Sequence, residues 1–449
     1  MRAIDISVGP SWFGFTRYQW RVFFVVWLGW ALDATDFSLF SLVLKPAVTE
    51  IVGGTGSPAD IGKWGGLLAM VGLLGWALGG MLFGVVADMI GRVRTLIISI
   101  VLVAVFTAGQ GLSQNILQFG VCRFLSGVGT GAEIVIGIPL VAEAFADKAA
   151  RAKVLGFMMT GAAFGSLFGG EIYNWLAPYG WRAVFYAGVM PAVALFFIRR
   201  NTDEPDHFTR LQNERAAIKQ AGATRDEDRA KLRVGMLQLF SRRHIYATTV
   251  GLLFCIGTLL SIWTSQIWLP TVQANMIKAS GITGPEAIQS LGWGTKLWGI
   301  GGILGYLCFG YLADWFGRRP TIAMYSVGTI ASGLYLYLYL GLPNWDLYPY
   351  VLPVFGFFVF GVFSGHAIWL PELFPTYVRA TSVSFCNGTG RIITSFGPLV
   401  AGLLAGAFGG NFQPRLRGHD ILCHAEPVGG ANRPRDATRA ITRIVIILG

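Results

Sequence analysis

Charged side chains are scarce in this chain of 449 residues. Asp, Glu, Lys and Arg together make up 13% of it, whereas 53% of the residues are hydrophobic. A soluble domain carries about 25% charged residues, so this chain cannot hide its apolar surface in one aqueous core. The composition therefore excludes an ordinary water-soluble domain and indicates lipid as the surrounding medium.

Cysteine and catalytic signatures are also scarce. The five cysteines, Cys122, Cys255, Cys308, Cys386 and Cys423, show no C-x-x-C pair and no Cys/His ligand spacing. This excludes a disulfide framework and a structural zinc site, and we expect free thiols. No H-E-x-x-H, G-x-S-x-G or Walker loop occurs. The sequence thus predicts no enzyme, no ATP-driven pump, no metal and no cofactor.

Long apolar stretches fill most of the chain. A membrane-spanning helix needs about 20 mostly apolar residues. Eleven stretches satisfy this requirement: 22–44, 64–86, 95–113, 116–142, 153–176, 181–198, 245–270, 289–312, 321–341, 347–371 and 382–409. We expect an all-α integral membrane protein with two pseudo-symmetric six-helix bundles, residues 1–198 and 245–409, joined by a polar cytoplasmic linker, residues 199–244.

The basic residues predict an orientation. With a cytoplasmic N-terminus, the loops near Arg92 and Arg318 and the arginine-rich linker lie inside, as the positive-inside rule requires. The net charge of +11 is then explained by the basic loops. We expect no nucleic-acid partner. We expect a multi-pass protein of the plasma membrane, typically a bacterial inner membrane, acting as a monomer.

The C-terminal tail does not fit this scheme. Residues 411–449 are polar and carry six arginines, and after eleven spans they would lie on the wrong side of the membrane. We expect a disrupted twelfth span, as after a frameshift or truncation. A genuine eleven-span or re-entrant variant is the alternative.

One short pattern occurs twice. It reads G-x-x-x-D-x-x-G-R and lies at residues 84–92 and 310–318, once in each half. Arginines follow each aspartate by four and six, or four and five, positions, which favours a clasp between helices. We predict gating contacts, against the alternative of plain basic loops, at Asp88, Arg92, Arg94, Asp314, Arg318, Arg319, Glu372 and Arg379.

With these motifs, the chain resembles the major facilitator superfamily. Residues 122–131, C-R-F-L-S-G-V-G-T-G, and 371–379, P-E-L-F-P-T-Y-V-R, resemble its motifs in the fourth span and after the tenth. The first span, with Asp33 and Asp36, is similar to that of sialic acid and aromatic acid transporters, although Ala34-Thr35 replaces Gly-Phe. The resemblance implies a metabolite–proton symporter and makes Asp36 and Arg123 a candidate proton-coupling pair.

Ionisable residues inside the apolar stretches are the best site candidates, because each costs about 2.5–3.5 kcal/mol at a helix centre. We expect proton coupling at Asp33, Asp36, Arg123 and Glu133, with a structural ion pair or a packing role as the alternative. We expect substrate binding in the second half at Lys296, His366 and Arg391. Arg391 could instead pair with an acid such as Glu372. His366 could instead relay protons or be a hydrogen-bonded core residue.

The predicted function is therefore secondary transport. A small carboxylated metabolite, such as sialic acid, an aromatic acid or a similar organic anion, is carried together with protons by alternating access. A sugar or drug carrier of the same superfamily is one alternative. A transport-inactive membrane protein with a broken C-terminus is the other.

Overall fold

Helices are the only regular secondary structure in the described part of the chain. The computed structural model describes residues 16–53, 57–145, 148–189, 239–242, 244–339, 346–375 and 378–407, and no strand occurs in these ranges. Seven described helices are long and apolar enough to cross a membrane: Gln19–Ile51, Pro58–Gly84, Arg94–Leu112, Ile245–Ala279, Gly284–Trp315, Tyr348–Ile368 and Thr381–Ala407. The count of eleven spans stays a prediction. Most of the predicted linker, and the tail, lie outside the described residues.

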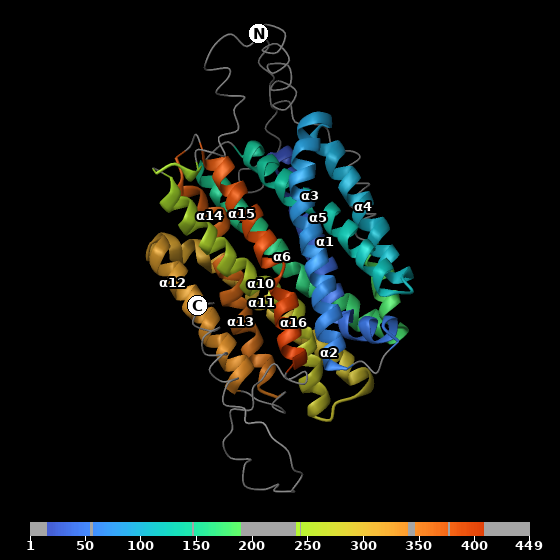
Figure 1. Cartoon of the computed structure of the whole chain (residues 1–449). Coiled ribbons are helices and arrows are strands. Elements are labelled where there is room, and N and C mark those ends of the chain that lie inside the picture. Colours follow the sequence, from blue (N-terminus) through green and yellow to red (C-terminus); the bar gives the residue numbers. More distant parts are fainter. Residues whose placement is uncertain are drawn as a thin grey trace.

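The helices form two groups in chain order (Figure 1). The first group contains α1 (Arg17–Ile51), α2 (Pro58–Asp60), η2 (Ile61–Gly65), α3 (Gly66–Ile90), α4 (Arg92–Leu112), α5 (Ile116–Ala144), α6 (Lys148–Leu176), η3 (Ala177–Tyr179) and a helix at 181–189. The second contains α10 (Ile245–Ala279), α11 (Gly284–Trp315), α12 (Arg318–Leu334), η5 (Tyr335–Tyr339), α13 (Tyr348–Phe363), α14 (Gly365–Ile368), η6 (Leu370–Leu373), α15 (Arg379–Thr394) and α16 (Gly397–Ala407).

The repeated motif forms the same turn twice. Gly91 ends α3 with φ 104° and ψ 157°, and Gly317 precedes α12 with φ 91° and ψ 160°. Only glycine adopts such angles readily, which explains why both copies place glycine at this position. α3 packs alongside α5, and α6 packs alongside α11. The residues that meet in these two contacts put both turns at one end of the bundle. We call this the motif end and the other the opposite end.

Two of the predicted spans contain a break in the helix. The stretch 347–371 divides into α13, α14 and η6, with a break at Ser364. The stretch 382–409 divides into α15 and α16, with a break at Ser395 and Phe396. The Ser395 hydroxyl donates to the Ile392 carbonyl oxygen at 2.7 Å. α16 begins at Gly397, and Pro398 in its first turn has no N–H for the ladder.

The two groups pack closely at the opposite end. A Cβ added to Gly62 in η2 would lie 2.1 Å from the carbonyl oxygen of Gly402 in α16, and one on Gly66 would lie 2.7 Å from the Cα of Leu399. Figure 1 shows α2 beside α16 at the lower end of the bundle. Glycine on both sides lets the backbones touch. We call the whole contact between the two groups the seam.

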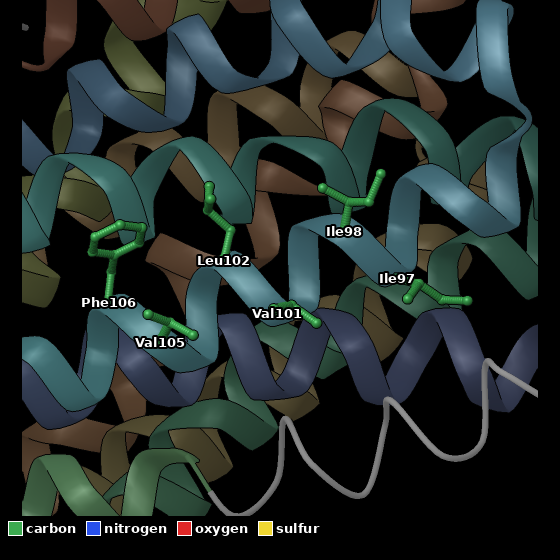
Figure 2. A pocket seen from close by; sticks show the side chains of 6 residues that line it. All are labelled: Ile97, Ile98, Val101, Leu102, Val105 and Phe106. Carbon is green, nitrogen blue, oxygen red and sulfur yellow. The ribbon is translucent and has the colours of Figure 1, made fainter.

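A shallow groove on α4 has no polar lining. Its volume is about 300 Å³, and it is lined by Ile97, Ile98, Val101, Leu102, Val105 and Phe106. Figure 2 shows all six side chains on this one helix. Ile98, Val101 and Val105 are exposed, as expected of side chains that face lipid tails. The groove offers no group that could orient a polar solute.

Candidate functional site

Asp36 and Arg123 form a buried ion pair in the first group. Asp36 lies in the middle of α1, and Arg123 lies two turns into α5. The Arg123 Nη1 donates to Asp36 Oδ2 at 2.7 Å, and the two residues are 1% and 5% exposed. The Thr107 hydroxyl on α4 donates to the other carboxylate oxygen at 2.9 Å. Three helices thus hold one carboxylate, and the pair expected from the sequence is formed.

The Arg123 guanidinium is positioned by two aromatic rings and a glycine. Its Cζ lies 4.6 Å from the ring centre of Phe37 and 4.0 Å from that of Phe40, distances at which a cation is attracted to the ring face. A Cβ added to Gly72 of α3 would lie 2.8 Å from Arg123 Nε, so only glycine leaves room there. The Nε and Nη2 atoms are buried and have no hydrogen-bond partner, which leaves guanidinium donors available.

The structure describes less of the other two candidates for proton coupling, Asp33 and Glu133. Asp33 lies one turn before Asp36 on α1 and is 6% exposed, as its predicted location inside the first span requires. The side chain of Glu133 on α5 lies outside the described residues. The described geometry therefore centres on Asp36.

An aromatic layer lies across the seam at the level of this ion pair. Trp76 of α3 lies with its ring centre 5.3 Å from that of Phe37 and 4.7 Å from that of Trp263 on α10. Trp263 also lies 5.1 Å from Phe37. The indole Nε1 atoms of Trp30, Trp76 and Trp263 are buried without a hydrogen-bond partner. The layer therefore combines flat apolar faces with unused N–H donors.

Arg391 contacts this layer from the second group. It lies in the last turn of α15, at the helix break, where a cation is favoured by the helix dipole. Its Cζ lies 4.2 Å from the ring centre of Trp76, and its Nε is buried without a partner. No described carboxylate forms a salt bridge with it. Arg123 and Arg391 thus approach the same aromatic layer from opposite halves.

Lys296 is not free, although we expected it to bind substrate. Its Nζ on α11 donates to Glu171 Oε2 on α6 at 2.6 Å, across the seam. It also lies 5.2 Å from the ring centre of Trp293. Sequence reasoning did not single out Glu171, although a charged residue inside the apolar stretch 153–176 was the same signal that identified the others. Lys45 similarly donates to Asn275 across the seam at 2.8 Å.

His366 is held by side chains of two other helices. Its Nε2 lies 2.6 Å from Thr258 Oγ1 of α10, and its Nδ1 lies 2.7 Å from Asn387 Oδ1 of α15. The ring packs on Phe363 with centres 4.4 Å apart and is 6% exposed. Thr258 and Asn387 were not singled out from the sequence, because hydroxyl and amide residues in apolar stretches are common.

Comparison with known proteins agrees with this architecture. A family model described as "Major Facilitator Superfamily" matches residues 26–398. The chain belongs to the major facilitator superfamily.

Relatives within the superfamily are named as carriers of organic acids. A "Probable 4-methylmuconolactone transporter" of Cupriavidus pinatubonensis is 29% identical over 393 residues, which cover 86% of this chain and 84% of that protein. A "Cis,cis-muconate transport protein" of Acinetobacter baylyi is 29% identical over 392 residues, covering 86% and 89%. The expected resemblance to organic-acid transporters is confirmed.

Among solved structures, the xylose transporter of E. coli in a partially occluded inward-open conformation matches with a TM-score of 0.65 and 18% identity. The match covers 88% of this chain and 96% of that one. The major facilitator fold is thus shown for this multi-pass membrane protein.

The superfamily motif in the second half forms a network at the motif end. Arg318 Nη1 donates to Asp314 Oδ1 at 2.5 Å, and Arg318 Nε lies 3.4 Å from Glu372 Oε2. The hydrogen bond from Arg318 to Asp314 is the main cause that raises the pKa of Arg318. Because Glu372 is engaged here, the alternative that it pairs with Arg391 is wrong.

The remaining gating candidates are less fully described by the structure. Arg94 and Arg319 are exposed at the motif end, and the side chains of Asp88, Arg92 and Arg379 lie outside the described residues.

Proposed function

We propose that this protein is a secondary transporter that carries a small carboxylated metabolite together with protons by alternating access. The observation that carries the proposal is the location of Arg391. It is a cation inside the bundle that contacts Trp76 across the seam, has a buried Nε without a partner, and forms a salt bridge with no described carboxylate. The residue as a whole is half-buried, and a cation inside a membrane-spanning bundle is costly unless an anion or water compensates it.

A carboxylate is the ligand that best satisfies this site. Arginine binds carboxylates through two parallel hydrogen bonds, and the nearby indole N–H groups of Trp30, Trp76 and Trp263 also lack acceptors. An acceptor-rich ligand with a flat, conjugated body would use both the donors and the aromatic faces. The names of the relatives, a muconolactone and a muconate transporter, support a carboxylated substrate.

Proton coupling is assigned to Asp36 and Arg123. When Arg123 is close, it favours the ionised carboxylate; when a helix movement withdraws it, the carboxyl group takes up a proton. The unpartnered Nε and Nη2 atoms of Arg123 could then hold water or a substrate oxygen. Asp33 and Glu133 are proposed to assist on the same side of the seam.

The gating residues and the orientation complete the proposal. The Asp314–Arg318–Glu372 network and its first-half counterpart at Asp88, Arg92 and Arg94 would hold the motif end closed in one state and separate in the other. We place the motif end in the cytoplasm of a bacterial inner-membrane protein, with a monomer as the functional unit. The closely packed opposite end is then the barrier toward the outside.

The test is uptake by proteoliposomes. Labelled cis,cis-muconate and benzoate are the probes, with the outside more acidic than the lumen. Wild-type protein should accumulate at least one probe, and unlabelled xylose should not compete. Arg391→Gln should abolish uptake, and Arg391→Lys should retain little, because lysine cannot form the bidentate contact. Arg242→Gln, a change of an exposed arginine outside the helices, should leave uptake unchanged.

Three results would contradict the proposal. Competition by xylose would favour a sugar carrier. Uptake that is independent of the pH gradient would contradict proton coupling. A wild-type protein that neither transports nor binds any carboxylate probe would support a transport-inactive protein.

A further inference from the structure

The hydrogen bonds around His366 leave one proton position open to exchange. The Asn387 Nδ2 donates to the Val383 carbonyl oxygen at 3.1 Å, so its Oδ1 is the atom that faces His366 Nδ1. An amide oxygen only accepts hydrogen bonds. His366 Nδ1 therefore carries a hydrogen in either charge state of the ring, and only Nε2 can gain or lose one.

Thr258 serves both states of Nε2. Its hydroxyl lies 2.6 Å from Nε2 and also within reach of two backbone carbonyl oxygens, at 2.8 Å on Phe254 and 3.3 Å on Cys255. When His366 is neutral, the hydroxyl donates to Nε2. When Nε2 carries a proton, it donates to Thr258 Oγ1, and the hydroxyl turns to a carbonyl. One rotation of the hydroxyl thus keeps both ring nitrogens hydrogen-bonded while the ring changes its charge.

We propose that His366 is a second proton-binding residue of the transport cycle, and that it takes up a proton on Nε2 when an anion binds at Arg391. The inference rests on the proposed function, since it uses the anion site assigned there. It differs from the Asp36–Arg123 pair in position, because His366 lies in the second half, and in mechanism, because no ion pair has to break.

Arg391 supplies the link between the anion and the proton. It lies on α15 four positions after Asn387, on the same helix face, and Asn387 Oδ1 lies 2.7 Å from His366 Nδ1. Two cations in a weakly polar interior repel each other. While the site is empty, the charge of Arg391 therefore opposes protonation of His366, in addition to the burial of the ring. A carboxylate on Arg391 cancels its charge and removes the repulsion. The proton enters with the anion and leaves with it.

Few other charges face His366. From α10 it is approached by Cys255, whose Sγ lies 3.8 Å from Nδ1, and from α15 by Arg391. Its aromatic neighbours, Phe254 and Phe363, do not titrate. α14 also packs against α6, whose described titratable residues, Glu171 and Tyr173, lie toward the opposite end. η6, which packs against α14 and α15, carries Glu372, and this carboxylate pairs with Arg318 at the motif end. Arg391 is then the charge near His366 that a bound anion would cancel.

The first test is a titration of the ring that needs no transport. Protein with ¹⁵N-labelled histidine is followed by NMR between about pH 4 and 8, with the His366→Gln spectrum assigning the signal. We expect His366 to titrate on Nε2, with its midpoint higher by about one pH unit or more in Arg391→Gln, where the repelling charge is gone. Adding benzoate to the wild type should shift it in the same direction.

Two variants sharpen this measurement. Thr258→Val removes the acceptor of the charged state and should move the midpoint to lower pH. Lys278→Gln, which removes an exposed positive charge at the opposite end, should leave the midpoint unchanged. A ring that stays neutral throughout, or a midpoint that is the same with and without Arg391, would overturn the proposal.

The second test separates the proton from the substrate. In proteoliposomes at equal pH, His366→Gln should still exchange labelled for unlabelled benzoate or muconate. Under a pH gradient it should lose the accumulation that wild type shows. His244→Gln, at the other described histidine, should behave as wild type. Full gradient-driven accumulation by His366→Gln would refute the inference and leave the transporter proposal standing. No transport by wild type would refute the transporter proposal, and the inference with it.

Discussion

The charges of Asp36 and Arg123 compensate each other inside the bundle. Removing one member of a buried pair leaves the other charge uncompensated and costs about 3–5 kcal/mol. We therefore predict that Asp36→Asn lowers the melting temperature in detergent, and that the double variant with Arg123→Gln recovers part of it. Neither variant should accumulate substrate under a pH gradient.

The control for this cycle is Asp346→Asn, at an exposed aspartate in a turn, which should change neither property. If Asp36→Asn kept both the wild-type melting temperature and gradient-driven uptake, the ion pair would be neither structural nor coupling.

Single residues were also where the sequence was most informative. A charge inside an apolar stretch is costly wherever it occurs, so Asp36, Arg123 and Arg391 could be identified without any structure. Their partners could not. Thr107 contacts Asp36 and Trp76 contacts Arg391 from other helices. Which side chains meet across helices depends on packing that no periodicity in one helix reveals.

Glycine in one helix leaves room for a group from the neighbouring helix to lie close to its backbone. A Cβ on Gly72 of α3 would lie 2.8 Å from Arg123 Nε. We predict that Gly72→Ala displaces the guanidinium, weakens its ion pair with Asp36, and costs about 1–3 kcal/mol, as overpacking does elsewhere. Thermal unfolding in detergent and gradient-driven uptake should both be impaired.

Gly257→Ala in α10 is the matched control, because a Cβ there would meet nothing within 4 Å. It should be neutral or slightly stabilising, since alanine favours a helix over glycine by about 1 kcal/mol. Equal effects of the two substitutions would show that Gly72 acts through helix propensity and not through Arg123.

The helix breaks mark the limit of prediction for elements. Hydropathy located the stretches 347–371 and 382–409, but it averages over about 20 residues and cannot detect one broken turn. The signals were local: Ser364-Gly365 in one stretch, and Ser395 followed by Pro398 in the other. His366 and Arg391 both lie beside these breaks, where irregular backbone in a membrane protein is tolerated only against protein or water.

For the whole molecule, the repeat in sequence predicted equivalent places in the fold for the two copies of the motif. The two motif copies adopt matching turns at Gly91 and Gly317 and lie at the same end of the bundle. The seam between the halves was not predictable. It is built from single contacts between helices remote in sequence, such as Lys296 with Glu171, and these exist only once the halves have met.

The glycine contact at the opposite end predicts a conformational effect. A Cβ on Gly62 would lie 2.1 Å from the Gly402 carbonyl oxygen, so Gly62→Ala cannot keep this packing without a backbone shift. The opposite end should then stay open. Spin labels at Leu117 and Ala279, in a background without the five cysteines, should report a longer distance than in wild type, and uptake should fall sharply.

Gly156→Ala in α6, where a Cβ meets nothing within 4 Å, should change neither the spin-label distance nor uptake. An unchanged distance in Gly62→Ala would mean that the contact with Gly402 is not what closes this end. A longer distance with normal uptake would mean that the transport cycle does not require closure there. Alternating access demands that each end close in turn, so only a variant that lengthens the distance and stops transport together agrees with the proposed cycle.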